Sequence, residues 1–129
     1  MNAIGPMRTA QAFESNVVRS RQKKIANITS LAGSFARGLP GAIAMNYSAS
    51  KAALNKYSTM LAYRLKPEGV LVGPFEPVFV ASKRDMDARL RAAAPIDREV
   101  AKLIRQIDAL SPETSGRIVN FTTGKIDPF

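Results

Sequence analysis

Three short runs of apolar and β-branched residues alternate with three helical segments along the sequence, and this alternation restricts the possible folds. The strand-like runs cover residues 24–29, 70–75 and 117–121, and the helical segments cover residues 2–20, 47–66 and 97–110. Strands that alternate with helices are typical of a parallel sheet built from right-handed crossovers. The continuous hydrophobicity of residues 70–75 also suits a strand covered on both faces. We therefore expect an α/β fold, with about three parallel strands and flanking helices.

The length of the chain and its missing residue types exclude several classes of protein. A chain of 129 residues has the size of one ordinary domain. The sequence has no cysteine and no histidine, so it contains no disulfide, no thiolate nucleophile and no imidazole metal ligand, and we predict no metal site. It also has no signal-peptide pattern and no apolar stretch near the ~18 residues of a membrane span. We therefore expect a cytoplasmic protein that does not enter a membrane.

The net charge of +9 is concentrated in one half of the sequence. Residues 1–67 contain ten lysines and arginines and a single acid, Glu14, whereas residues 68–129 contain nine residues of each sign. Such asymmetry is typical either of a nucleic-acid or membrane surface, or of a half that faces an acidic partner. No aromatic residue interleaves the basic cluster at 19–24, so we interpret it as a solvated helix end and do not expect nucleic-acid binding.

Three polar side chains form a candidate catalytic group. Ser30 follows the strand-like run at 24–29, at the carboxyl edge of the predicted sheet, where open α/β sheets bind ligands. Tyr47 and Lys51 are four residues apart, so both project from one face of the helix predicted at 47–66. A nearby ammonium stabilises a phenolate, and a serine hydroxyl can hold an oxygen atom. Together the three groups can move a proton to or from a carbonyl or alcohol oxygen.

The strings around these residues resemble a known family. Residues 27–34 read NITSLAGS and residues 47–55 read YSASKAALN. They are similar to the strand-end serine and the Tyr-x-x-x-Lys helix of the short-chain dehydrogenase/reductase (SDR) family. The strings LKPEGV at 65–70 and LSPETSGR at 110–117 resemble its C-factor-like branch. The resemblance covers essentially all of the chain, but it matches only the C-terminal half of a family member.

This resemblance implies a partial Rossmann-type domain over residues 1–129, belonging to an NAD(P)-dependent oxidoreductase. The expected reaction is hydride transfer between a nicotinamide cofactor and a small-molecule carbonyl or secondary alcohol. Tyr47 would be the acid/base, and Lys51 would lower its pKa and bind the nicotinamide ribose. Ser30 would position the substrate oxygen, and Asn2 matches the family's asparagine that supports a relay water near the lysine.

The resemblance also indicates where the cofactor, NAD or NADP, would be held. Beside Tyr47 and Lys51, the family's contacts with the nicotinamide end match Pro77, Val80 and Ser82. The family's glycine-rich phosphate-binding turn has no counterpart in these residues, because the glycines at 33, 38 and 41 lack the G-x-G-x-x-G spacing.

The missing turn leaves a second interpretation open. The chain is expected to be either the catalytic half of a longer oxidoreductase or a truncated, inactive remnant that serves as a dimerising or interaction module. In the family, the two helices that match 2–20 and 47–66 build a dimer interface. A homo-oligomer through these helices is therefore expected in either case.

Overall fold

The computed structural model describes residues 1–36, 45–76, 96–120 and 125–127. The helices are α1 (Ile4–Arg19), α2 (Met45–Leu65) and α4 (Ile96–Asp108), with short 3₁₀ turns η1 (Leu31–Gly33) and η3 (Lys66–Glu68). The strands are β1 (Lys24–Ile28), β2 (Leu71–Glu76), β3 (Ile118–Asn120) and β4 (Ile126–Asp127). The predicted segments therefore lie within one or two residues of the observed ones. Each of the three predicted helices and three predicted strands is present.

The strands form one sheet in the order β1-β2-β3-β4. The first three strands run parallel, with Ala26 beside Gly73 and Phe75 beside Val119. This confirms the prediction of a three-stranded parallel α/β sheet. The short β4 pairs with β3 in the antiparallel sense. The sequence analysis expected no strand there, because two residues carry too little periodicity to indicate one.

Strand β1 lies at the edge of this sheet. Within the described ranges it has one hydrogen-bonded neighbour, β2. The side chain of Ile28 at its end remains 42% exposed. A parallel strand with an open edge is a site for pairing with further chain, so the sheet can be extended at β1.

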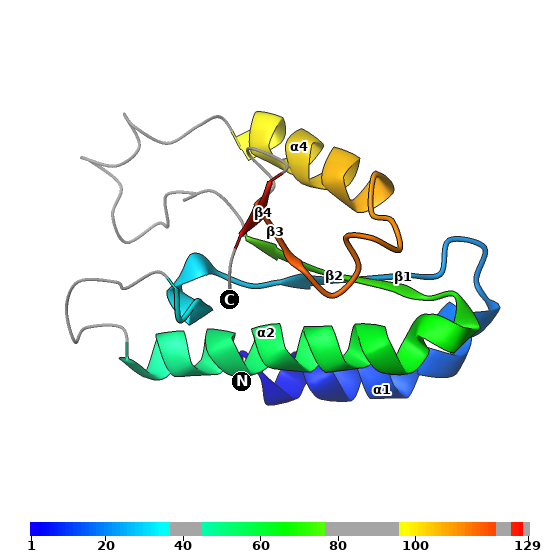
Figure 1. Cartoon of the computed structure of the whole chain (residues 1–129), viewed down its shortest axis with the longest axis horizontal. Coiled ribbons are helices and arrows are strands. Elements are labelled where there is room, and N and C mark those ends of the chain that lie inside the picture. Colours follow the sequence, from blue (N-terminus) through cyan, green and yellow to red (C-terminus); the bar gives the residue numbers. More distant parts are fainter. Residues whose placement is uncertain (37–44, 77–95, 121–124, 128–129) are drawn as a thin grey trace.

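Helices cover both faces of the sheet. Helices α1 and α2 lie side by side on one face, and α4 lies on the other (Figure 1). The predicted apolar stripe of α2 is confirmed as packing, since Leu54, Leu61 and Leu65 are each no more than 2% exposed. On the α4 face, Phe75 is fully buried and packs among apolar side chains of that helix. None of the helices in the described residues has the length and apolar character that crossing a membrane requires.

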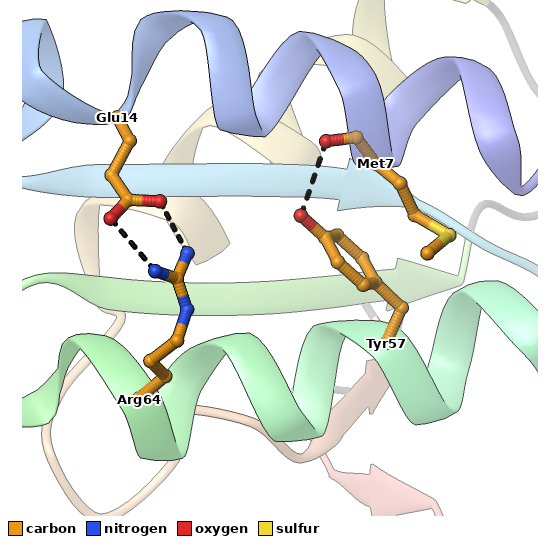
Figure 2. A network of polar contacts seen from close by, with 4 residues as sticks. All are labelled: Met7, Glu14, Tyr57 and Arg64. Atoms are coloured by element: carbon orange, nitrogen blue, oxygen red, sulfur yellow. Dashed lines mark hydrogen bonds and ion pairs between the residues drawn. The ribbon is translucent and has the colours of Figure 1, made fainter.

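Two polar bridges fix α2 against α1 (Figure 2). The hydroxyl of Tyr57 donates to the carbonyl oxygen of Met7 at 3.2 Å. About two turns further along α2, the guanidinium of Arg64 binds both carboxylate oxygens of Glu14. The hydrogen bond with Glu14 raises the pKa of Arg64 above its usual value. These contacts hold the helix that carries the candidate residues at a fixed position on the sheet.

A lysine of β1 caps the helix on the other face. The Nζ atom of Lys24 donates to the carbonyl oxygens of Ile107 at 2.8 Å and of Asp108 at 2.7 Å. The last carbonyls of a helix have no partner within the helix, and they form its negative end. Lys24 therefore satisfies two of these acceptors and ties the end of α4 to the edge strand.

Candidate active site

Ser30 lies just beyond the carboxyl end of β1, at the edge of the sheet where the sequence analysis placed it. Its backbone is extended, and its Oγ atom accepts a hydrogen bond from the backbone N–H of Ala32 at 3.2 Å. This bond caps η1 and uses only a lone pair of the oxygen. The proton of the Ser30 hydroxyl is therefore left for an oxygen atom of a ligand.

Tyr47 and Lys51 lie in the first turns of α2. The Lys51 Nζ atom is 5.7 Å from the centre of the Tyr47 ring, and it donates to the carbonyl oxygen of Ile28 at 2.8 Å. That carbonyl belongs to the end of β1, two residues before Ser30. Partial burial lowers the pKa of Lys51 from its ordinary value of 10.5. Tyr47 is 45% exposed, so its hydroxyl is accessible to a ligand.

A glycine brings the serine loop into direct contact with this helix. A Cβ atom at Gly33 would lie 2.5 Å from the backbone N of Ala52 and from the backbone C of Lys51. Only a residue without a side chain allows η1 to approach the backbone of α2 so closely. Gly33 therefore sets the separation between the loop after Ser30 and the helical turn of Lys51. The sequence analysis considered Gly33 only as a candidate for the phosphate-binding turn and missed this role.

Buried polar pairs hold β1 on α2 just below the candidate residues. The hydroxyl of Thr29 donates to the Oδ1 atom of Asn55, and both side chains are 1% exposed. One turn further along α2, Asn27 donates to the Oγ atom of Ser58 at 2.9 Å. Apart from the Thr29 contact, the Asn55 amide is incompletely satisfied, since its Nδ2 atom is buried without a partner among the described residues. The pairs fix how β1 lies along α2.

A signal for these pairs was present in the sequence. Asn27 and Thr29 are two apart in a strand and so share one face of the sheet. Asn55 and Ser58 are three apart in a helix and lie on the buried side of α2. Polar residues on two buried faces must meet each other, because a buried polar group without a partner costs about 1–3 kcal/mol.

Asn2 is connected to Tyr47 through a serine and not directly to Lys51. Its Nδ2 atom donates to the Oγ atom of Ser50 at 3.3 Å, and that hydroxyl donates to the carbonyl oxygen of Tyr47 at 2.7 Å. The segment before α1 is thereby joined to the first turn of α2.

The remaining residues expected at the cofactor, Pro77, Val80 and Ser82, lie outside the described residues. Their contacts with a nicotinamide ring therefore stay predictions.

The described groups suit a ligand that carries neighbouring hydroxyls beside a carbonyl or alcohol. The Lys51 ammonium has three N–H donors, and Ile28 takes one of them. In the part of the chain described here, no further hydrogen-bond acceptor contacts this ammonium. Two donors of Lys51 and the exposed hydroxyl of Tyr47 match the acceptors of a ribose diol. The Ser30 hydroxyl supplies a separate donor at the end of β1.

The sequence that carries these motifs is similar to known proteins over most of its length. Residues 1–94 match the family model described as short chain dehydrogenase. The chain is 34% identical over 121 residues to C-signal of Myxococcus xanthus, an alignment that covers 94% of this chain and 70% of that protein. It is 33% identical over 119 residues to 1-hydroxy-2-glutathionyl-2-methyl-3-butene dehydrogenase of Rhodococcus sp. (strain AD45), covering 91% and 51% of the two chains.

Solved structures of carbonyl reductases have a fold similar to that of this chain. The NADPH-bound carbonyl reductase from chicken fatty liver superposes with a TM-score of 0.86 at 25% identity, covering 99% of this chain and 54% of that one. A carbonyl reductase from Pseudomonas aeruginosa PAO1 gives a TM-score of 0.80 at 25% identity, covering 100% and 53%. The chain thus spans about half the length of these reductases and of the Rhodococcus enzyme.

Proposed function

The chain belongs to the short-chain dehydrogenase family, and from that premise we propose that it forms the proton-transfer half of an NAD(P)-dependent oxidoreductase. The substrate would be a small-molecule carbonyl compound or secondary alcohol. The observation that carries the proposal is the placement of the Lys51 ammonium, which lies between the end of β1 and the ring of Tyr47.

In this proposal, Tyr47 transfers the proton. A phenol with a reference pKa of ~10 is a weak acid and, at neutral pH, a scarce base. The Lys51 ammonium stabilises the phenolate that is left when Tyr47 gives its proton to a carbonyl oxygen. In the reverse direction the same phenolate accepts the proton of an alcohol. Partial burial of Lys51 strengthens this effect, because water screens the charge less there.

Ser30 would hold the reacting oxygen, since its hydroxyl proton is not used by the bond from Ala32. Asn2 would act through Ser50, by fixing the first turn of α2 and with it the direction of Tyr47. Proper positioning of this kind matters, since a misplacement of about 1 Å in an active site can lower a rate by roughly 10²-fold.

A nicotinamide cofactor, either NAD or NADP, would supply or accept the hydride when bound. Lys51 and Tyr47 would bind the hydroxyls of its nicotinamide ribose, and Pro77, Val80 and Ser82 would contact the nicotinamide end. Solved relatives carry such a cofactor: NADPH in the chicken reductase, and NADP in a Burkholderia multivorans protein and in a Pseudomonas aeruginosa carbonyl reductase. The 129 residues contain no glycine-rich turn for the diphosphate, so we propose that another segment provides it.

A second function, as a dimerising or interaction module without activity, is favoured by the exposed surface of α1 and α2. These neighbouring helices leave five large apolar side chains 53–79% exposed: Ile4, Phe13, Met45, Met60 and Tyr63. Exposed apolar side chains on neighbouring helices can contribute to a protein interface. We propose a homo-oligomer through these two helices whether or not the chain is catalytic.

Cofactor titration and turnover separate the two functions. The purified chain is titrated with NADH and with NADPH, and the oxidation of each is followed with a panel of aldehydes and ketones. If these residues are sufficient for catalysis without the segment that holds the diphosphate, we expect saturable binding and turnover that Tyr47→Phe abolishes. Tyr63→Phe is the matched control, because Tyr63 is on the same helix, 79% exposed and away from Lys51.

Absence of both saturable cofactor binding and Tyr47-dependent turnover would contradict catalysis by these residues alone. Sedimentation velocity then tests the second function. A dimer that Phe13→Glu dissociates supports an interaction module, and a monomer contradicts it.

A further inference from the structure

A hollow lies at the opposite end of the sheet from Ser30. It has a volume of about 610 Å³ and lies where β2 and β3 begin. The last turns of α2 form one wall, and residues 112–117 before β3 form the other. Pockets of roughly 300–1,000 Å³ are typical of sites for small molecules. The size of the hollow therefore suits a small ligand.

The walls of this hollow are held by hydrogen bonds, so it is formed before any ligand arrives. The backbone N–H of Gly116 donates to the carbonyl oxygen of Val72 at 2.7 Å. The hydroxyl of Thr59 on α2 donates to the carbonyl oxygen of Gly116 at 2.9 Å. From the sheet, the N–H of Val72 donates to the Oγ atom of Ser115 at 3.0 Å. The wall formed by residues 112–117 is thus fixed both to β2 and to the facing wall, α2.

The lining of the hollow combines an apolar interior with positive charge. Tyr63, which is exposed, and Leu71, which is half-buried, supply its accessible apolar surface, whereas the lining residues Ala62 and Val70 are buried. Lys66 and Arg117 also line it, and among the described residues no carboxylate does. Neither cation has a side-chain hydrogen bond or ion pair with any residue that the structure describes. The charge of the hollow therefore complements an anion, and its interior complements a hydrocarbon chain.

We propose that this hollow binds a small amphipathic carboxylate of the medium-chain fatty acid class. The hydrocarbon chain lies against Tyr63 and Leu71, and the carboxylate pairs with Lys66 and Arg117. This site is independent of the proposed catalytic function, because it shares no residue with the group around Tyr47 and lies at the other end of the strands.

Titration of the whole chain with octanoate, followed by ¹H–¹⁵N NMR, tests the proposal. The amides of Gly69 and Gly116 report on the hollow, and the amide of Gly5 on α1 reports on a distant surface. We expect saturable shifts at the first two and none at Gly5. Hexanoate, which lacks two methylenes, is expected to bind about tenfold more weakly.

A charge variant and a neutral ligand complete the test. Exposed ion pairs contribute modestly, so Lys66→Gln/Arg117→Gln is expected to weaken octanoate binding by about three- to tenfold. Binding of 1-octanol is expected to be equal in the variant and the wild type. Arg8→Gln/Lys56→Gln is the matched control, since it removes two cations that do not line the hollow, and it should bind octanoate like the wild type.

Three results would overturn the proposal. One is that the shifts of the Gly69 and Gly116 amides do not saturate with octanoate. Another is octanoate affinity that falls equally in the two charge variants. The third is a shift of Gly116 that follows protein concentration without octanoate, which would assign the hollow to contact between copies of the chain.

Discussion

Replacing Gly33 with alanine tests whether the serine loop rests directly on the backbone of α2. The added Cβ would lie 2.5 Å from two backbone atoms of Lys51 and Ala52, whereas ordinary contacts begin near 3.4 Å. The loop or the helix must therefore move by about 1 Å, because backbone atoms cannot rotate away as a side chain does. Such overpacking costs about 1–3 kcal/mol.

The net effect includes a gain from the unfolded chain. Gly33 is not among the residues with positive φ, so alanine adopts its backbone conformation without strain. The loss of freedom in the unfolded state then stabilises the variant by about 0.4–1 kcal/mol. With central values of about 2 kcal/mol for the cost and about 0.7 kcal/mol for the gain, Gly33→Ala is less stable by about 1.3 kcal/mol. For a domain of this size, that corresponds to a fall in Tm of roughly 4–8 °C.

The assay is urea and thermal unfolding followed by circular dichroism, with Gly5→Ala as the control. A Cβ at Gly5 meets no atom within 4 Å, and Gly5 lies in α1. Alanine there should leave stability unchanged or raise it by up to about 1 kcal/mol. A Gly33→Ala variant at least as stable as the wild type would refute the direct contact between the loop and α2.

Three further predictions follow from contacts described above. Lys24→Met should lower stability by about 1–2 kcal/mol and speed amide hydrogen exchange in the last turn of α4, because two helix carbonyls lose a charged donor; unchanged exchange there would contradict the cap. Thr29→Val should lower the free energy of unfolding by about 1–3 kcal/mol, because it leaves the buried Asn55 without its partner. Thr29→Val/Asn55→Leu should recover part of that loss, because it removes both members of the pair. Urea unfolding measures both variants, and a double variant less stable than the single one would refute the pairing. Burial lowers the pKa of Lys51 in the folded state below its unfolded value of 10.5. The free energy of unfolding should therefore rise with pH between the folded pKa and 10.5, and Lys51→Met should remove that rise. An NMR titration of the Lys51 side chain with its midpoint at or above 10.5 would contradict this prediction.

Much of the fold was predictable from periodicity. Strand β2 is a run of apolar residues and is buried on both faces, and α2 carries an apolar stripe that packs on the sheet. Each of these patterns is local, so it can be recognised along the sequence. By contrast, β4 has two residues, and its pairing with β3 depends on where the chain returns in space. No local pattern reports such a return.

The candidate site shows the same division. Ser30, Tyr47 and Lys51 were identified from strand and helix positions and from family resemblance, and the structure brings the loop of Ser30 onto the helix of the other two. Gly33 was missed because its role depends on its contact with the backbone of α2, and a glycine can occur in a loop for several other structural reasons. The pairing of Thr29 with Asn55 was missed although both residues lie on faces that the pattern buries, because no local pattern says which polar residue of the strand meets which polar residue of the helix.

The contacts that bring the loop of Ser30 onto the helix of Tyr47 and Lys51 close a loop of moderate length. The bond from Lys51 to Ile28 spans 23 residues, and the bond from Thr29 to Asn55 spans 26. Loop-closure entropy rises only with the logarithm of loop length, and contacts of low sequence separation form early in folding. We therefore expect closing β1 onto α2 to cost little loop entropy, so that the relative position of Ser30, Tyr47 and Lys51 depends mainly on the contacts between these two elements.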